Sequence, residues 1–325
     1  MIKQRLKSLR DLAYSARECL LNQVSVPLVV LIYHRVIDLP TDPQQLAVRP
    51  VRFRQQLQAL KDAFEIRRFD QSWAGLDRPT VVITFDDGYA DNLEYALPVL
   101  EELEIPATFF ITTGYVGSSR ELWWDELERV LLCSSGGTTL SRIGPIVLDR
   151  AYDCAQASER EALYHTIHPQ LKILGVAERE SALADVAVAM TGTPEARSSY
   201  RVMNVNELAQ MASSPMVTLG AHTVSHQPLS SLSVTDQGAE IEDSRTQLCD
   251  WIERPVNVFS YPFGDRGDYT QDTVDLCRKA GFIRVAANHA GVVRRTTDPF
   301  RVPRFLVRDW PADELLFRLR RFAGL

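Results

Sequence analysis

The chain has 325 residues, of which 36 are Lys or Arg and 42 are Asp or Glu, so its formal net charge is −6. This length is enough for one large α/β domain or two smaller ones, and the absence of a basic excess disfavours a nucleic-acid partner. The five cysteines are scattered and form no CxxC pair, which indicates free thiols and not a zinc-cysteine site or a disulfide framework.

An amphipathic helix is predicted at the N-terminus, within residues 1–25. Apolar residues recur there at helical spacing, with five Lys or Arg between them. Such a helix lies on an anionic membrane surface or covers the open bottom of a barrel, and the second is the more ordinary arrangement. Neither a signal peptide nor a run of about 18 apolar residues is found, so we expect a cytoplasmic protein with at most peripheral membrane contact.

Strands and helices alternate along most of the remaining chain. Short apolar runs rich in β-branched residues predict buried parallel strands at residues 28–33, 80–85, 107–112, 217–221, 256–261 and 282–287. Helical periodicity lies between them, at residues 53–63, 93–103, 236–251 and 270–280. This alternation predicts a parallel sheet, open or closed, in an α/β domain that spans residues 26–325.

The alternation breaks between about residue 117 and residue 203. Helical stretches are predicted there at residues 121–133, 158–174 and 178–190, with the Ser/Gly-rich "SSGGTT" after the first of them. We interpret this segment as a mostly helical insertion in a βα loop, without a separate core.

Two adjacent aspartates end the second predicted strand. In "VVITFDDGYADN", Asp86 and Asp87 follow an apolar run directly and precede Gly88. Two carboxylates near one spot repel each other unless a cation lies between them or one carries a proton. A capped turn is the alternative, because Asp and Gly are common turn residues.

A pair of histidines ends another predicted strand. In "LGAHTVSHQPLS", His222 and His226 are four residues apart, and one helical turn would put both imidazoles on one face, able to grip one ion. One carboxylate with two imidazoles is a common catalytic metal set. The two stretches together favour a metal site, in which one Asp binds the ion and the other accepts a proton from an activated water.

With these motifs the sequence resembles the polysaccharide deacetylases, metal-dependent de-N-acetylases of amino-sugar polymers, and in particular the branch acting on bacterial exopolysaccharides. The motifs that carry the resemblance are "TFDDGY" (84–89), "HTVSH" (222–226), "YPFG" (261–264), "YHRV" (33–36) and "RVPRF" (301–305). The resemblance covers most of the chain outside the helical insertion. It implies a distorted (β/α)₇ barrel, which agrees with the strand count.

The resemblance also implies roles for individual residues. Asp86 would be the general base. Asp87 would bind the metal together with His222 and His226. The backbone N–H of Phe263 would donate to the oxyanion, since a main-chain donor tolerates a changed side chain.

One position departs from the family pattern. The third motif usually carries an Arg, then two residues, then an aromatic residue, and this chain has Ser260 at the Arg position. What holds Asp86 is therefore open. Arg304 is the candidate substitute tether, and an ordinary Arg with no catalytic role is the alternative.

The general acid that protonates the leaving amine is also open. The family usually places it on a late histidine, for which His289 is a candidate, although its surroundings depart from the usual motif. His34, at the end of a predicted strand, is the other candidate and the preferred one, since barrel active sites form at the carboxyl ends of strands. His165 and His168 in the insertion are left without a role.

Aromatic residues are candidates for substrate binding. Trp123 and Trp124 in "ELWWDELE" follow a predicted barrel strand and could stack on sugar rings, although one ring of such a pair more often lies in the core. Tyr261 in "YPFG" is the third candidate.

The sequence thus predicts a metal-dependent hydrolase that removes N-acetyl groups from an amino-sugar polysaccharide or a lipid-linked glycan. The same site acting on another amide, or a catalytically dead glycan-binding protein, are the alternatives. Zinc is the first choice of metal for a carboxylate and two imidazoles, and cobalt, nickel or iron fit as well.

Overall fold

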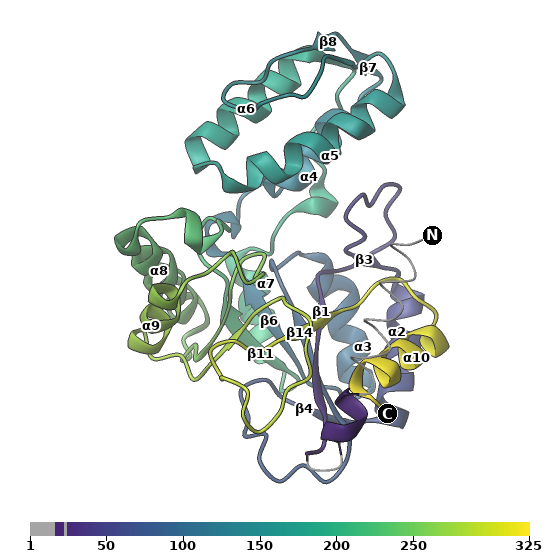
Figure 1. Ribbon diagram of the computed structural model, residues 1–325, viewed down its shortest axis with the longest axis vertical. Coiled ribbons are helices and arrows are strands. Elements are labelled where there is room, and N and C mark those ends of the chain that lie inside the picture. Colours follow the sequence, from purple (N-terminus) through teal and green to yellow (C-terminus); the bar gives the residue numbers. More distant parts are fainter. Residues whose placement is uncertain (1–16, 23–24) are drawn as a thin grey trace.

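A parallel barrel forms the centre of the computed structural model, which describes residues 17–22 and 25–325 (Figure 1). Its sheet has eight strands, and seven of them follow one continuous path in which every pair is parallel. In order along this path they are β13 (Arg284–Ala286), β12 (Val258–Ser260), β11 (Val217–Ala221), β6 (Ala107–Ile111), β5 (Thr80–Phe85), β1 (Leu28–Tyr33) and β14 (Arg304–Leu306). The eighth strand, β4 (Glu65–Arg67), pairs with the first half of β5.

The two ends of this path meet, so the sheet is nearly a closed barrel. Val302, just before β14, forms a parallel bridge with Ala286 of β13. The N–H of Ala287 donates to the Val302 carbonyl at 2.8 Å, and the Arg304 N–H donates to the His289 carbonyl at 3.1 Å. The predicted (β/α)₇ barrel is confirmed.

Alternation along the strands separates the barrel interior from the helix-covered outside. Val30, Val82 and Phe110 belong to one buried cluster in the interior, whereas their strand neighbours pack in the larger cluster beneath the helices. Gly220 leaves space for the Phe110 ring, because a Cβ at position 220 would lie 2.6 Å from that ring. Small interior residues of this kind also leave room for a long polar side chain.

Helices cover the outside of the barrel, in the places where the sequence predicted them and in two more. In Figure 1, α8 and α9 lie on one side of the strands, and α2, α3 and α10 lie on the other. The structure gives α2 (Pro50–Ala63), α3 (Leu97–Glu102), α7 (Val205–Ser213), α8 (Val234–Ile252), α9 (Gln271–Lys279) and α10 (Ala312–Ala323). Sequence reasoning missed α7 and α10, and it took the π-helical turn Asn92–Ala96 together with α3 as one helix.

A separate helical layer lies at one end of the barrel (Figure 1). It consists of α4 (Trp123–Leu132), α5 (Ala157–Ile173) and α6 (Val176–Ala189), with four two-residue strands, β7 (Gly136–Gly137), β8 (Thr139–Leu140), β9 (Tyr152–Asp153) and β10 (Met190–Thr191). These helices have a hydrophobic cluster of their own, around Leu127, Leu163 and Val186. The expectation that this segment has no separate core was wrong, because three helices can bury apolar side chains among themselves.

The two remaining short strands form a loop that leads from β1 to the first helix. They are β2 (Arg35–Val36) and β3 (Ala47–Val48), which pair in parallel. The predicted N-terminal helix falls largely on residues outside the described part of the chain. Within the described residues, no helix is both long and apolar enough to cross a membrane.

Candidate metal centre and active site

The two aspartates lie side by side because the chain turns sharply after β5. The Asp86 N–H still continues the sheet by donating to the Tyr33 carbonyl at 3.1 Å. Asp87 then adopts a left-handed backbone with φ of 76°, which Asp tolerates better than most residues. Gly88 follows with φ of 85°, and a Cβ there would lie 3.1 Å from Ile111. The turn brings both carboxylates into one buried hollow.

The two histidines are brought together by a loop and not by the helical turn expected from their spacing. Residues 222–226 form no helix, and Thr223 and His226 have left-handed φ values of 63° and 55°. Glu240 of α8 holds the loop, because its carboxylate accepts the N–H groups of Val224 at 2.8 Å and Ser225 at 2.9 Å. Positive-φ residues that are not Gly mark strain that the surroundings must hold in place.

Asp87, His222 and His226 form a candidate metal site. Each is buried, and one ligand atom from each lies within 4.8 Å of the others. The Asp87 Oδ1 is 3.2 Å from His226 Nε2 and 3.7 Å from His222 Nε2. The His222 Nδ1 lies 2.7 Å from the Ser260 carbonyl, to which it donates, and this bond leaves Nε2 as the lone-pair donor toward the site. A carboxylate with two neutral imidazoles fits a divalent metal.

The electrostatics of the two histidines agree with this assignment. Burial lowers the pKa of His222 to about 4 and the pKa of His226 to about 3. Both imidazoles are therefore neutral near pH 7, which is the form that binds a metal. Burial also raises the pKa of Asp87, whose charge has no cationic side chain hydrogen-bonded to it among the described residues. A cation between these three groups would stabilise the carboxylate.

Asp86 is held differently, by a buried arginine, Arg304, at the start of β14, which is separated from β5 by β1 alone in the sheet. The two terminal nitrogens of Arg304 donate to the two oxygens of Asp86, both at 2.7 Å. Ser260 shares the network, since its hydroxyl lies 2.9 Å from Arg304 Nη2 and 3.2 Å from Asp86 Oδ2. Burial opposes ionisation of Asp86, but the charge of Arg304 and its hydrogen bonds outweigh burial and hold the pKa of Asp86 well below its usual range.

This arrangement answers the question raised by Ser260. A serine is short enough to leave the space that the Arg304 guanidinium fills inside the barrel. The tether to Asp86 that the sequence predicted for Arg304 is present as a bidentate contact, which is the strongest geometry for such a pair.

A pocket of about 770 Å³, including its part open to solvent, surrounds these residues. His34 lines it, and its pKa is lowered by burial, with Asp87 and Asp86 opposing that shift. Phe263 lines it too, with its ring 4.8 Å from the His226 ring. Trp124 completes this group, with its ring 4.7 Å from His226. Without the space open to solvent the cavity volume is about 240 Å³, slightly below the usual range for ligand pockets of roughly 300–1,000 Å³.

Three other candidates do not line this pocket, although Asn288, next to one of them, does. His289 does not line it, and the charges that act on its pKa are Arg266 and Asp265 and not the two aspartates. Tyr261 is fully buried, stacks on Tyr269 and donates to the Phe300 carbonyl at 3.1 Å. Trp123 is 2% exposed and packs within the helical layer.

Several residues at the site were not found from the sequence. Asp91 and Asn92 fix the chain at His34 and just after it: the Asn92 amide donates to the His34 carbonyl at 2.9 Å, and the Asp91 carboxylate accepts from Arg35 Nε at 2.8 Å. Lys172 and Arg308 line the pocket. Asp91 and Asn92 could have been found from the sequence, because they lie in the stretch "YADN" that follows the double aspartate and Gly88. Nothing in the sequence places Lys172 near the site.

The chain belongs to the polysaccharide deacetylase family, whose model, described as "Polysaccharide deacetylase", matches residues 74–132 and 186–285. It is therefore a hydrolase of the class that acts on carbon–nitrogen bonds other than peptide bonds, as the motifs predicted. The matched segments contain Asp86, Asp87, His222 and His226, and they exclude residues 133–185, where α5 lies. A comparison with curated proteins found no significant match.

Solved structures with the same fold include three deacetylase-related proteins. IcaB from Ammonifex degensii is 21% identical with a TM-score of 0.58, and the alignment covers 92% of this chain and 98% of IcaB. The deacetylase PplD from Streptococcus pyogenes, solved in complex with acetate, is 17% identical with a TM-score of 0.57, covering 90% and 98% of the two chains. The BpsB deacetylase domain from Bordetella bronchiseptica is 15% identical with a TM-score of 0.54, covering 87% and 96%. At these identities the comparison supports the fold.

Proposed function

We propose that this protein is a metal-dependent deacetylase that hydrolyses the N-acetyl group of an amino sugar within a polysaccharide or a lipid-linked glycan. The observation that carries the proposal is the convergence of an arginine-paired aspartate with a buried Asp–His–His set in one pocket of a polysaccharide deacetylase barrel. The complex of PplD with acetate, on the same fold, is consistent with this reaction.

Asp87, His222 and His226 are the proposed metal ligands. A divalent metal at this position supplies Lewis-acid chemistry, which polarises a carbonyl and makes water more acidic. Zinc is the proposed ion, because a carboxylate and two imidazoles suit it, and cobalt, nickel or iron would suit the same donors.

Asp86 is the proposed general base. Its two contacts with Arg304 fix the carboxylate, so an Asp86 oxygen is positioned to take a proton from the water that attacks the acetyl carbon. The same contacts keep Asp86 ionised, as a proton acceptor must be. The pairing with Arg304 fixes the Asp86 carboxylate but also lowers its affinity for a proton. Asp86 could therefore deprotonate the attacking water only if a bound metal made that water more acidic.

Phe263 is the proposed main-chain donor to the oxyanion that forms when the carbonyl carbon becomes tetrahedral. It lies in the pocket wall with a left-handed φ of 60°, and its N–H donates to no other backbone group among the described residues. A fixed N–H aimed at the developing charge stabilises the transition state without reorganisation.

His34 is the proposed general acid. It lines the pocket within the electrostatic influence of both aspartates, and its Nδ1 is buried without a hydrogen-bond partner among the described residues. After the water oxygen has added to the acetyl carbon, proton donation by His34 to the nitrogen of the tetrahedral species would allow the C–N bond to break, which leaves acetate and the free amine. His289 lies outside the pocket, so the geometry favours His34.

Acetate release tests the proposed function directly. The purified protein, loaded with zinc, is incubated with N-acetylglucosamine and two linkage series of its oligomers, and free acetate is measured. We expect acetate that disappears in the presence of a chelator and in Asp86→Asn. Release of no acetate from any of these glycans would contradict the proposal, and binding of the glycans without release would favour a glycan-binding protein.

A further inference from the structure

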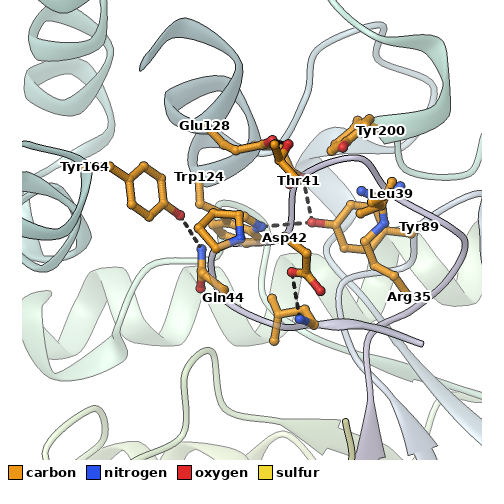
Figure 2. A pocket seen from close by; sticks show the side chains of 13 residues that line it. Arg35, Leu39, Thr41, Asp42, Gln44, Tyr89, Trp124, Glu128, Tyr164 and Tyr200 are labelled. Carbon is orange, nitrogen blue, oxygen red and sulfur yellow. Dashed lines mark hydrogen bonds between the residues drawn. The ribbon is translucent and has the colours of Figure 1, made fainter. Parts of the chain in front are cut away.

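Helix α5 of the helical layer lies along one side of the pocket mouth. Its residues Tyr164, His168 and Lys172 are four apart and share one face of the helix. The Gln44 amide, which lines the pocket, donates to the Tyr164 hydroxyl at 3.1 Å and lies 3.1 Å from His168 Nε2. Figure 2 shows the Tyr164–Gln44 contact, with Trp124 to one side of it. The middle of α5 is thus joined to the loop between β2 and β3.

The C-terminal end of α5 is joined to two other barrel loops. Lys172 Nζ forms an ion pair with Asp268 Oδ1 at 2.6 Å, and it lies 4.3 Å above the Phe263 ring. The Gln227 amide donates to the Leu174 carbonyl, just after the helix, at 2.9 Å. Through these contacts, α5 spans the pocket mouth from the β2–β3 loop to the loops after β11 and β12.

The pocket also ends blindly beneath Gln44. The hollow that continues there shares Gln44, Leu46 and Trp124 with the main pocket (Figure 2), and its cavity volume of about 20 Å³ has room for a water molecule but not for a sugar ring. A hydrogen bond from the Thr41 hydroxyl to Glu128 joins the loop to α4 across this hollow. Buried side chains, including those of Arg35, Tyr89 and Asp125, form its floor.

The remaining side of the pocket carries no contact of this kind. Asn288, Leu306 and Arg308, which follow β13 or lie on and after β14, line the pocket there, and no hydrogen bond or ion pair joins them to the described residues of the helical layer. The Arg308 Nη1 instead donates to the carbonyls of Gln44 and Gln45, within the barrel loops.

We propose that the pocket is blind-ended and accepts an amino sugar at the end of a glycan and not one in its interior. An interior sugar has a neighbour on both sides and needs two exits from the site, whereas an end sugar needs only one. This inference rests on the proposed deacetylase function and adds the substrate class to it. It comes from α5, which lies outside the segments matched by the family model, so it is a property of this chain's own helical layer.

The position of the freed amine along an oligomer tests the proposal. The zinc-loaded protein is incubated with N-acetylglucosamine oligomers from dimer to hexamer, and the products are sequenced by mass spectrometry. We expect loss of one acetyl group per molecule, always at the same end, with a preference of about tenfold or more over interior residues, a ratio that needs only 1.4 kcal/mol. A sugar cap on that end should abolish the reaction.

The results separate the two proposals. Acetyl loss at interior residues, or at several residues of one chain, would overturn the blind-ended pocket and leave the deacetylase function standing. No acetate from any oligomer or from the monosaccharide would overturn the deacetylase function and the inference with it.

Variants test the part played by α5. The double variant Lys172→Ala with Gln227→Ala releases the end of α5 from the barrel loops, and we expect its preference for the end residue to fall several-fold. Arg150→Ala is the matched control, because it breaks an exposed ion pair with Glu159 within the same layer, away from the pocket lining. An unchanged preference in a folded double variant, or an equal fall in the control, would contradict α5 as the barrier.

Discussion

The barrel and the helical layer bury carboxylates in different ways. In the barrel, Asp86 is paired with Arg304 through two hydrogen bonds, and its pKa is held well below the usual range. In the helical layer, Asp125 accepts a hydrogen bond of 2.6 Å from the Tyr89 hydroxyl, and burial raises its pKa to about 7. One region therefore keeps an ionised group ready for proton transfer, while the other keeps a carboxyl that readily holds its proton.

The barrel and the helical layer also differ in how some of their helices begin. Around the barrel, α7 and α9 begin with complete capping boxes, and Ser233 caps α8. No side chain caps the first turn of α4, α5 or α6 in the layer. The barrel helices α2, α3 and α10 also begin without a side-chain cap, so local capping distinguishes only α7, α8 and α9 from the helices of the layer.

Breaking the barrel's ion pair should have the largest effect. Arg304→Met removes the charge at similar length and leaves Asp86 buried without its partner. We expect the free energy of unfolding to fall by about 3–5 kcal/mol, with loss of activity, as measured by urea denaturation and acetate release. Arg54→Met, which breaks an exposed pair with Glu102, is the control and should change little.

A reciprocal variant sharpens this prediction. Ser260→Arg combined with Arg304→Ser moves the guanidinium to the position where the family usually has it. If the tether to Asp86 is what matters, the double variant should recover part of the activity lost in Arg304→Ser. Equal activity in the two variants would contradict that account.

Replacement of His34 tests its proposed role as the general acid in the pocket. We expect His34→Ala to lower kcat by about 10²-fold or more, with metal still bound, and to remove the alkaline limb of the pH–rate profile, as loss of a general acid does. His168→Ala, on the pocket-facing side of α5, should leave that limb in place.

His289→Ala should behave like wild type, because His289 lies outside the pocket. A kinetic defect in His289→Ala with a normal His34→Ala would assign the acid to the late histidine instead.

Asp125 tests the other half of the comparison. Its folded-state pKa, about 7, lies above the ordinary aspartate value of 3.8, so the folded protein holds a proton that the unfolded chain releases in this interval. The contribution of Asp125 to stability is therefore full below about pH 4 and is lost as the pH rises toward 7, by a few kcal/mol at most. Asp125→Asn should flatten the dependence of unfolding free energy on pH in this window. An unchanged slope would show that Asp125 is ionised in the folded protein.

The smallest expected effect concerns a helix cap. The Asn204 side chain accepts the Glu207 N–H at 3.0 Å at the start of α7. Asn204→Ala should lower the free energy of unfolding by about 1 kcal/mol, measured by thermal or urea denaturation, with no change in acetate release per folded molecule. Gln156→Ala, at the uncapped start of α5, is the matched control and should have a smaller effect.

The barrel could be predicted from the sequence because its strands are buried on both faces. Such strands appear as continuous apolar runs, and three of them, β1, β5 and β11, have the predicted bounds. The short strand β4 was missed, since three partly exposed residues carry no such pattern. The last strand, β14, was recognised only as part of the motif "RVPRF".

The candidate site could be predicted in part for a similar reason. Asp86, Asp87, His222 and His226 each lie next to a recognisable strand end, so motif and position agreed. The loop that joins the two histidines could not be predicted, because Glu240, which holds it, is distant in the sequence. Lys172 reaches the site only through the packing of α5 against the barrel loops, a long-range contact that local patterns do not encode.

The metal content of five purified proteins tests the central claim most directly. Wild type, Asp87→Ala, His222→Ala, His226→Ala and Asp86→Asn are loaded with zinc, freed of excess ion and analysed by elemental analysis together with their acetate release. The account predicts bound metal in wild type and Asp86→Asn only, because each of the other three variants lacks one of just three protein ligands. Full occupancy in any of those three, or loss of metal in Asp86→Asn with near-normal turnover, would contradict it.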